Sequence, residues 1–408
     1  MTSGSCLLCN SNLQLVLSLG RQAYVNTYLP LDSSQAPSKH PLELCVCTNP
    51  NCRHLQLSHQ APPEELFSHY LWVTGTAKTS KAYANKLADS IISSAKEASS
   101  IVEIASNDGT FLRPFLSKGL NVLGVEPAKN IASQAINEGI PTICDFFNEK
   151  TVSECQKYFN APPDIILARN VVPHTPNPKE MVAAISKLAG PHTSIFIEVH
   201  CFEAIESDLQ YDSIYHEHYS YFSAYTLSNL FAQFDLQLVS VRRTDISGGS
   251  LFFHFQHKQN NLTTSNEALT LIERSKQLHS PSVLDKFSQR CQRHAQSLRS
   301  KFTQLKNQYP HLKFYSFGSS ARGNTVLTYT GLSQQLDLCI DSSPLKWHTI
   351  NASTGLKIVP LADVDTGVEF VLYLAAWNFK DEIIEYMNAN GLYPKAILVP
   401  FPGQPELF

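Results

Sequence analysis

Ile101-Val-Glu-Ile-Ala-Ser-Asn-Asp-Gly109 is an apolar strand followed by a small polar turn, and it decides the fold of this 408-residue chain. The turn is expected to begin a helix. A second strand, Val122-Leu-Gly-Val-Glu126, ends in an acidic residue about twenty positions later. Three further apolar segments continue the alternation, at residues 140–143, 164–168 and 194–199. This pattern predicts a doubly wound parallel sheet, whose ligands bind beyond the carboxyl ends of its strands.

The sheet is expected to finish in an unusual order. After the fifth strand comes a helix near residues 224–234, followed by two successive strands at 236–242 and 248–255. Two final strands in hairpin succession are what the sheet of class I methyltransferases requires. We therefore expect an α/β fold built on a class I methyltransferase doubly wound sheet.

The turn at residues 105–109 also predicts the kind of cofactor. A dinucleotide needs G-x-G-x-x-G there, because its diphosphate binds bare backbone amides, and this chain has no such glycine cluster. Carboxylates at this edge would repel a diphosphate but suit a cationic, phosphate-free ligand such as S-adenosylmethionine. The residues expected to contact it are Glu103, Ser106, Asn107, Asp108, Gly109, Glu126, Asp145, Phe146 and Asn170.

The segment Asp212-Ser-Ile-Tyr-His-Glu-His-Tyr-Ser-Tyr221 follows the fifth strand and groups acid-base side chains. Imidazoles and a carboxylate accept protons near neutral pH, and phenols can donate to an oxyanion. Two other interpretations stay open from the residues alone. The aromatic side chains could simply pack at a corner, or His216 and His218 could form an HxH metal pair.

Five of the ten cysteines fall within the first 52 residues. Two pairs, Cys6 with Cys9 and Cys47 with Cys52, predict a closed four-thiolate site for structural zinc. Cys45 or His54 could replace one of these ligands. Because this small segment has little hydrophobic core of its own, the metal would supply part of its folding free energy.

Length and composition limit the classes of protein. The chain is long enough for two or three domains, and its 43% hydrophobic and 16% charged residues are ordinary for a globular protein. A formal net charge of -3 does not favour nucleic acid as a partner. We find no signal-peptide pattern and no apolar run of about 18 residues. A soluble, cytoplasmic and monomeric protein is expected.

Four segments are predicted in chain order. A zinc-binding domain covers 1–65, a cofactor domain 66–260, a helical arm divided at Pro281 covers 261–308, and a second, smaller Rossmann-like α/β domain covers 309–408. Residues 64–93, which begin at the end of the first segment, are predicted to be helical.

The chain resembles the sugar C-methyltransferases that act on nucleotide-linked 4-keto-deoxysugars. Asp212-Ser-Ile-Tyr-His-Glu-His is the most specific of the shared motifs, and the match spans nearly the whole chain. The other motifs are Arg53-His-Leu-Gln-Leu57, Tyr70-Leu-Trp-Val-Thr-Gly-Thr76, Glu103-Ile-Ala-Ser-Asn-Asp-Gly109, Ala168-Arg-Asn-Val-Val-Pro-His174, Gly248-Gly-Ser-Leu251, Tyr315-Ser-Phe-Gly-Ser-Ser-Ala-Arg-Gly-Asn-Thr325 and Ala376-Trp-Asn-Phe-Lys-Asp-Glu-Ile383.

The resemblance implies roles for individual residues. His218 would be the general base that removes the hydrogen beside the 4-keto group, and the resulting enolate would take the methyl group of S-adenosylmethionine. Tyr215 and Glu217 would be its catalytic neighbours, Tyr70 a tyrosine of the cleft, and His216 structural. The C-terminal domain would help to hold the nucleotide sugar.

The chain departs from the family pattern at several positions. Ser247 and Phe252 stand where a His and an Arg are common, and Ser316 and Arg322 stand where a Gly and a Lys are usual. These differences bear on the nucleotide and the sugar more than on the cofactor. Two alternatives are therefore kept, an O- or N-methyltransferase of another small metabolite and a catalytically silent, zinc-stapled binding protein.

Overall fold

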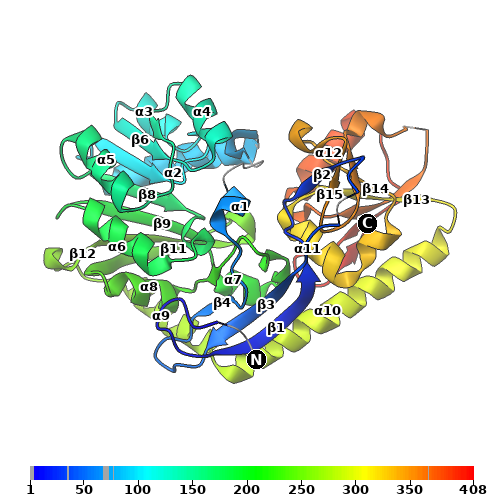
Figure 1. Ribbon diagram of the computed structural model, residues 1–408, viewed down its shortest axis with the longest axis horizontal. Coiled ribbons are helices and arrows are strands. Elements are labelled where there is room, and N and C mark those ends of the chain that lie inside the picture. The colour runs from blue at the N-terminus through cyan, green and yellow to red at the C-terminus, as the bar shows by residue number, and fades with distance from the viewer. Residues whose placement is uncertain (1–3, 35, 68–72, 77, 366) are drawn as a thin grey trace.

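The computed structural model describes residues 4–34, 36–67, 73–76, 78–365 and 367–408. Two α/β lobes lie side by side, with N-terminal strands and one long helix running beneath them (Figure 1). None of the described helices is long and apolar enough to cross a membrane.

The first lobe is built on a seven-stranded sheet of order β7-β6-β5-β8-β9-β12-β11. Strand β12 pairs antiparallel with both of its neighbours, whereas the pairs from β7 to β9 are parallel. The strands are β5 (Ser100–Ile104), β6 (Asn121–Val125), β7 (Thr142–Ile143), β8 (Ile165–Arg169), β9 (Ser194–His200), β11 (Leu236–Thr244) and β12 (Ser250–His257). This is the order of the class I methyltransferase sheet, so the expected fold is confirmed.

Helices cover both faces of this sheet because its strands are apolar on both sides (Figure 1). One face packs on α2 and α3, and the other on α5, α6 and α8. The helices of the lobe are α2 (Lys78–Ser94), α3 (Arg113–Ser117), α4 (Lys129–Asn137), α5 (Glu149–Phe159), α6 (Pro178–Leu188), α7 (Phe202–Ser207) and α8 (Ala224–Ala232). The strand order reverses between β5 and β8, which is where a doubly wound sheet binds its ligand.

The predicted helix over residues 64–93 is wrong as a continuous element. Helix α1 (Pro63–Phe67) and α2 are separated by a short 3-10 helix at Thr74–Thr76. The break has a local cause: Asn107 Oδ1 accepts the amide hydrogen of Thr74 at 2.8 Å, and Asp108 Oδ2 accepts that of Gly75 at 3.0 Å. In a continuous helix these two amides would instead donate to backbone carbonyls one turn earlier.

The N-terminal segment is shared between two sheets. Strands β1 (Leu13–Gln22), β3 (His40–Cys47) and β4 (Leu55–Leu57) form a small antiparallel sheet with β10 (Ser220–Tyr221), which directly follows the His216–His218 segment. Strand β2 (Tyr28–Pro30) instead pairs with the C-terminal sheet.

The C-terminal lobe holds an eight-stranded sheet of order β19-β18-β17-β13-β14-β16-β15-β2, with a parallel centre. Its remaining strands are β13 (Lys313–Phe317), β14 (Leu338–Ile340), β15 (Thr349–Asn351), β16 (Lys357–Val359), β17 (Phe370–Leu374), β18 (Ala396–Val399) and β19 (Glu406–Leu407). Helices α11 (Ala321–Thr330) and α12 (Lys380–Ala389) accompany this sheet. The predicted arm is two helices, α9 (Asn266–Leu278) and α10 (Pro281–Gln308), divided at Pro281 as expected.

One hydrophobic core joins the C-terminal lobe to the N-terminal strands and to the segment after β9. It includes Leu44 of β3, Phe202 of α7, Tyr211, Phe287 of α10 and Phe314 of β13. Because these side chains share one core, the segment that carries Tyr215 and His218 is packed against the C-terminal lobe as well as the methyltransferase sheet.

Candidate active site and metal centre

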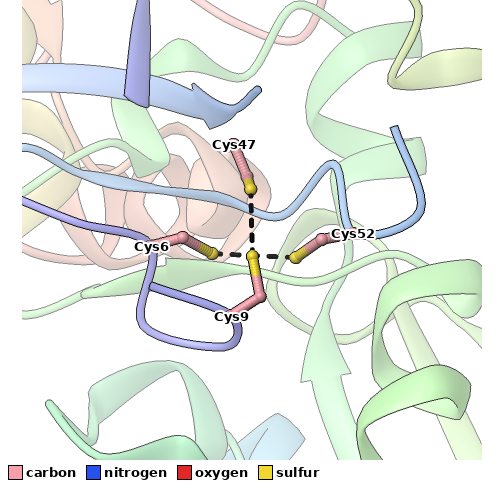
Figure 2. A group of neighbouring side chains, drawn as sticks. All are labelled: Cys6, Cys9, Cys47 and Cys52. Atoms are coloured by element: carbon pink, nitrogen blue, oxygen red, sulfur yellow. Dashed lines mark hydrogen bonds between the residues drawn. The ribbon is translucent and has the colours of Figure 1, made fainter. Parts of the chain in front are cut away.

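The structure brings the four predicted zinc ligands together. The sulfurs of Cys6 and Cys52 lie 3.6 Å apart and those of Cys9 and Cys47 lie 3.4 Å apart, and all four fall within 4.8 Å of one another (Figure 2). Tetrahedral zinc with Zn–S bonds of about 2.3 Å separates its sulfurs by about 3.8 Å. The donor set therefore fits a structural zinc ion, with no position left for a substrate.

The two alternative ligands lie outside this cluster. Cys45 and His54 are buried, but among the described residues the four cysteines are the one group of three or more side chains able to hold a metal ion. His54 Nε2 instead shares a hydrogen bond of 3.0 Å with Ser220 Oγ on β10.

The predicted cofactor residues gather at the carboxyl ends of β5 and β6. Ala105, Asn107 and Gly109 have φ angles of 56°, 50° and 75°, so the turn bends sharply after the strand. The Glu126 carboxylate accepts the amide hydrogens of Asn107 and Ala128, both at 2.9 Å. These two contacts fix Glu126 at the end of β6 and leave further lone pairs on both of its oxygens.

Several buried polar atoms at this edge have no hydrogen-bond partner among the described residues. They are Glu103 Oε2, Ser106 Oγ and Asn170 Oδ1. Buried polar groups are usually paired, so three unpaired atoms at this edge of the sheet point to a ligand with polar groups of its own. The ammonium and ribose hydroxyls of S-adenosylmethionine are polar groups of this kind, so the residues fit that cofactor.

The remaining predicted cofactor residues have protein partners. The Asp108 carboxylate accepts the amide hydrogens of Gly75 and Thr110, so Asp108 positions the Thr74–Thr76 turn. Asp145 pairs with Lys150 at 2.8 Å, which lowers the pKa of Asp145, and Phe146 beside it is half-buried.

Burial raises the pKa of Glu103 to about 8, although Arg169 nearby opposes this change. Arg169 itself forms an ion pair with the fully buried Glu198 at 2.7 Å, and its guanidinium lies over the ring of Phe111 at 3.4 Å. Tyr83 donates a hydrogen bond of 2.5 Å to Glu198. This buried pair could not be predicted from local sequence, because Arg169 and Glu198 lie on two different strands, β8 and β9, that pair only in the folded sheet.

The proposed base, His218, has a defined tautomer. Its Nδ1 lies 2.9 Å from the carbonyl oxygen of Ser213, which can only accept, so Nδ1 carries the proton. The lone pair is then on Nε2, which accepts the hydroxyl hydrogen of Tyr215 at 3.0 Å. Both side chains are half-buried, so a ligand can reach them.

Two further histidines surround His218 and were not among the predicted site residues. The His174 ring lies 4.6 Å from the His218 ring, centre to centre, and His200 ends strand β9. Burial, followed by His174 and His200, lowers the pKa of His218 well below its ordinary value of 6.5. His174 closes the shared motif Ala168–His174, but nothing in that motif indicates that His174 lies beside His218.

Glu217 and Tyr215 lie close together. Glu217 is buried, and its Oε1 accepts a hydrogen bond of 2.5 Å from Asn26 Nδ2 in the N-terminal segment. Burial, with Glu217 as the next cause, raises the pKa of Tyr215. Tyr215 is therefore a protonated donor at neutral pH.

The HxH interpretation does not fit the geometry. His216 points away from His218, towards the N-terminal segment, where its Nε2 lies 3.2 Å from the Pro41 carbonyl oxygen and its ring meets Tyr24 and His40. Tyr70, the predicted cleft tyrosine, lies outside the described residues.

Three family models match along the chain: a zinc-binding domain at residues 6–67, a methyltransferase domain at 78–241 and a C-methyltransferase C-terminal domain at 245–402. The C-methyltransferase NovU of Streptomyces niveus is 27% identical over 408 residues, covering 97% of this chain and 95% of the relative.

Solved structures that match part of the chain are more distant. Magnesium protoporphyrin IX methyltransferase from Synechocystis, with bound S-adenosylmethionine, is 9% identical, covering 42% of this chain and 79% of that one with a TM-score of 0.32. An S-adenosylmethionine-dependent methyltransferase from Clostridium acetobutylicum is 10% identical, covering 45% and 93% with a TM-score of 0.36. Taken together, the family models and the full-length relative show an S-adenosylmethionine-dependent C-methyltransferase that carries a zinc-binding domain at its N-terminal end.

Proposed function

We propose that this enzyme methylates the carbon beside the ketone of a nucleotide-linked keto-deoxysugar, with His218 as the general base. The observation that carries the proposal is the His218 geometry: Nδ1 is held by the Ser213 carbonyl, and the Nε2 lone pair meets the Tyr215 hydroxyl. The full-length likeness to the C-methyltransferase NovU supports the transfer to carbon.

His218 is suited to removing a proton at neutral pH. A carbonyl group acidifies the hydrogen on the neighbouring carbon, so a neutral imidazole can take it once the ring is correctly placed. The pKa of His218 lies well below 6.5 because the ring is buried, so the ring is neutral at pH 7. Its proton-bearing Nδ1 stays on Ser213, and the imidazolium formed after transfer keeps that hydrogen bond.

Tyr215 is suited to stabilising the enolate oxygen. Its raised pKa keeps the phenol protonated, so it can turn its hydrogen from His218 Nε2 towards the developing oxyanion. One such donor is typically worth about 3–4 kcal/mol in the transition state. Glu217, held by Asn26, keeps the segment in place and adds negative charge beside the phenol.

The proposed cofactor residues surround the turn after β5. Bound S-adenosylmethionine supplies an electrophilic methyl group. Glu126 would hold ribose hydroxyls, and the unpaired oxygens of Glu103, Ser106 and Asn170 would pair with the remaining polar groups of the cofactor. Asp108 would act indirectly, through the Thr74–Thr76 turn, while zinc on the four cysteines would stabilise the fold.

Product analysis tests the proposal. Wild-type enzyme is incubated with methyl-13C-labelled S-adenosylmethionine and a panel of nucleotide-linked keto-deoxysugars, with the matching sugars that lack the ketone as controls. We expect a labelled methyl group on the carbon beside the ketone, seen by its carbon–carbon correlations in NMR. A labelled methyl on oxygen or nitrogen, or equal transfer to the sugars without a ketone, would contradict it.

A further inference from the structure

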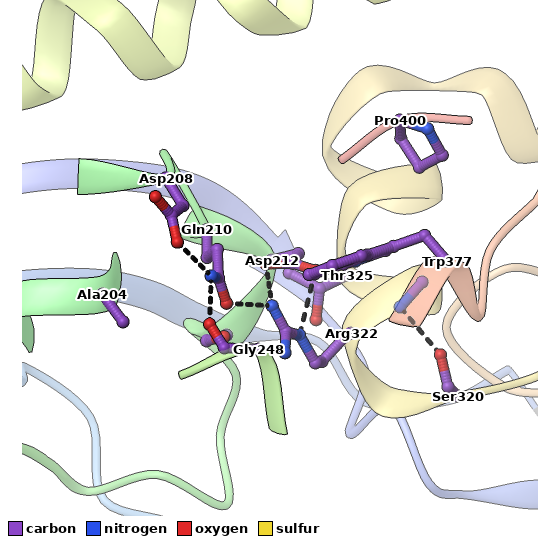
Figure 3. A network of polar contacts seen from close by, with 12 residues as sticks. Ala204, Asp208, Gln210, Asp212, Gly248, Ser320, Arg322, Thr325, Trp377 and Pro400 are labelled. Carbon is purple, nitrogen blue, oxygen red and sulfur yellow. Dashed lines mark hydrogen bonds and ion pairs between the residues drawn. The ribbon is translucent and has the colours of Figure 1, made fainter. Parts of the chain in front are cut away.

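Arg322 in the C-terminal lobe and Asp212 in the segment after β9 form a two-pronged ion pair between the lobes (Figure 3). Arg322 Nε and Nη2 each donate to one Asp212 oxygen at 2.9 Å. Trp377 Nε1 donates to Asp212 Oδ2 at 2.7 Å. Arg322 Nη2 also reaches Gln210 Oε1 at 2.7 Å, and Gln210 donates to the Gly248 carbonyl at 2.6 Å.

A single residue, Ser213, links this ion pair to His218. Asp212 and Ser213 are neighbours in the 3-10 helix Tyr211–Ser213, and the Ser213 carbonyl accepts the Nδ1 hydrogen of His218. Displacing Asp212 would therefore move the group that fixes the His218 tautomer. Among the described residues, the Asp212 carboxylate accepts side-chain hydrogen bonds from Arg322 and Trp377, both of the C-terminal lobe.

The pair is buried enough to act as a rigid support. The Asp212 side chain is 1% exposed and that of Arg322 is 15% exposed. Charge-assisted bonds in a fork geometry fix orientation as well as distance, and burial shields them from salt. Tyr211 adds a second anchor, because its hydroxyl meets His294 Nδ1 on α10 at 2.9 Å.

Arg322 occupies the second position of α11, directly after the turn that contains Gly318, where β13 ends. A ligand or a movement that shifts this turn would also shift the guanidinium that holds Asp212. The contact therefore links the position of the C-terminal lobe to that of the base.

We propose that Arg322 and Asp212 are a positioning pair, through which the C-terminal lobe holds His218 in its reactive orientation. This inference rests on the proposed role of His218 as the base. Neither residue needs to touch the reacting atoms. The pair acts through Ser213.

A double-mutant cycle tests the pair. Arg322→Gln and Asp212→Asn should each lower kcat by about 10- to 100-fold with a smaller change in KM, because a small misplacement of a base slows the chemical step. The kcat of the double variant should lie within about threefold of the kcat of the slower single variant, since both changes remove the same contact. Arg322→Lys, which keeps the charge but not the fork, should recover part of the loss.

Arg290→Gln is the matched control. Arg290 of α10 pairs with Glu206 of α7 at 2.6 Å, another contact between helices that does not involve the Tyr211–His218 segment. Its removal should leave kcat within about twofold of wild type. Additive losses in the double variant, or an equal loss in Arg290→Gln, would show that the pair is general structural support and overturn the inference.

A readout without substrate separates this inference from the proposed function. The protein is labelled with nitrogen-15 at its histidines, and the signals that disappear in His218→Asn are those of His218. A pH titration followed by NMR then gives the pKa and the tautomer of this ring. Removing the Asp212 charge by Asp212→Asn would, by electrostatics alone, lower the pKa of His218 further. If the pair positions the ring, the pKa should instead rise towards 6.5 and the single Nδ1-protonated form should be lost.

Unchanged or lower pKa with the same tautomer in Asp212→Asn would overturn the positioning role, whatever the substrate. If wild-type protein transfers no methyl group to any keto sugar while the tautomer still changes in Asp212→Asn, the substrate proposal fails and the positioning pair stands.

Discussion

We expect Glu103 to make the stability of this protein fall as pH rises, and the substitution Glu103→Gln isolates the effect. The carboxyl is fully buried at the end of β5, where desolvation raises its pKa from an ordinary 4.5 to about 8. In the unfolded chain the proton leaves near pH 4.5, whereas the folded protein keeps it until about pH 8. Between these values the unfolded state binds fewer protons, so the free energy of unfolding decreases with rising pH.

A tenfold change in proton affinity corresponds to about 1.4 kcal/mol. Across the window from pH 4.5 to above pH 8, the contribution of Glu103 therefore amounts to roughly 4–5 kcal/mol. The amide in Glu103→Gln has nearly the same shape and stays neutral, so it removes the titration without emptying the site. The buried histidines have lowered pKa values and titrate alike in both proteins, so they cancel in the difference.

Urea unfolding at intervals from pH 5 to pH 9 measures this difference. We expect wild type to lose about 3–5 kcal/mol relative to Glu103→Gln between the two ends of the range. Glu382→Gln, an exposed position on α12, is the matched control and should follow the wild-type curve. A difference between wild type and Glu103→Gln that stays constant within about 1 kcal/mol would refute the reasoning.

Three further outcomes are expected. Cys47→Ser should reduce bound zinc, measured by metal analysis, and lower the thermal midpoint by at least about 5 °C, whereas Cys45→Ala, a buried cysteine outside the cluster, should keep its zinc. Gly109→Ala should weaken binding of S-adenosylhomocysteine in calorimetry and destabilise the fold by about 1–3 kcal/mol, because φ is +75° and a Cβ would lie 2.8 Å from Ile140; unchanged affinity would contradict this. The acid limb of kcat/KM should lie well below pH 6.5, because the pKa of His218 is lowered and the free base persists until pH falls through that value.

The central sheet could be predicted from the sequence because its strands carry continuous apolar runs and end in recognisable turns. The terminal hairpin of β11 and β12 was visible for the same reason. The four cysteines were equally clear, since zinc fixes both the residue type and the spacing. A dense local motif indicated an acid-base cluster, the family resemblance assigned roles to His218 and Tyr215 within it, and the structure places these two side chains in contact.

The remaining features depend on contacts between distant parts of the chain. Asp212 and Arg322 are 110 positions apart, and no local pattern pairs them. The same holds for Asn26 with Glu217, and for β10, which completes the N-terminal sheet. The break before α2 arises because Asn107 and Asp108 capture amide hydrogens of Thr74 and Gly75, which helix periodicity cannot indicate.

Deuterium exchange tests the central claim most directly, because it detects proton removal without methyl transfer. A nucleotide-linked keto-deoxysugar is incubated in heavy water with enzyme and S-adenosylhomocysteine, and NMR follows the hydrogen on the carbon beside the ketone. Wild type is expected to exchange this hydrogen well above the rate without enzyme, and His218→Asn to fall to that background while still binding S-adenosylhomocysteine. Exchange at the wild-type rate in His218→Asn would contradict the assignment of His218 as the base.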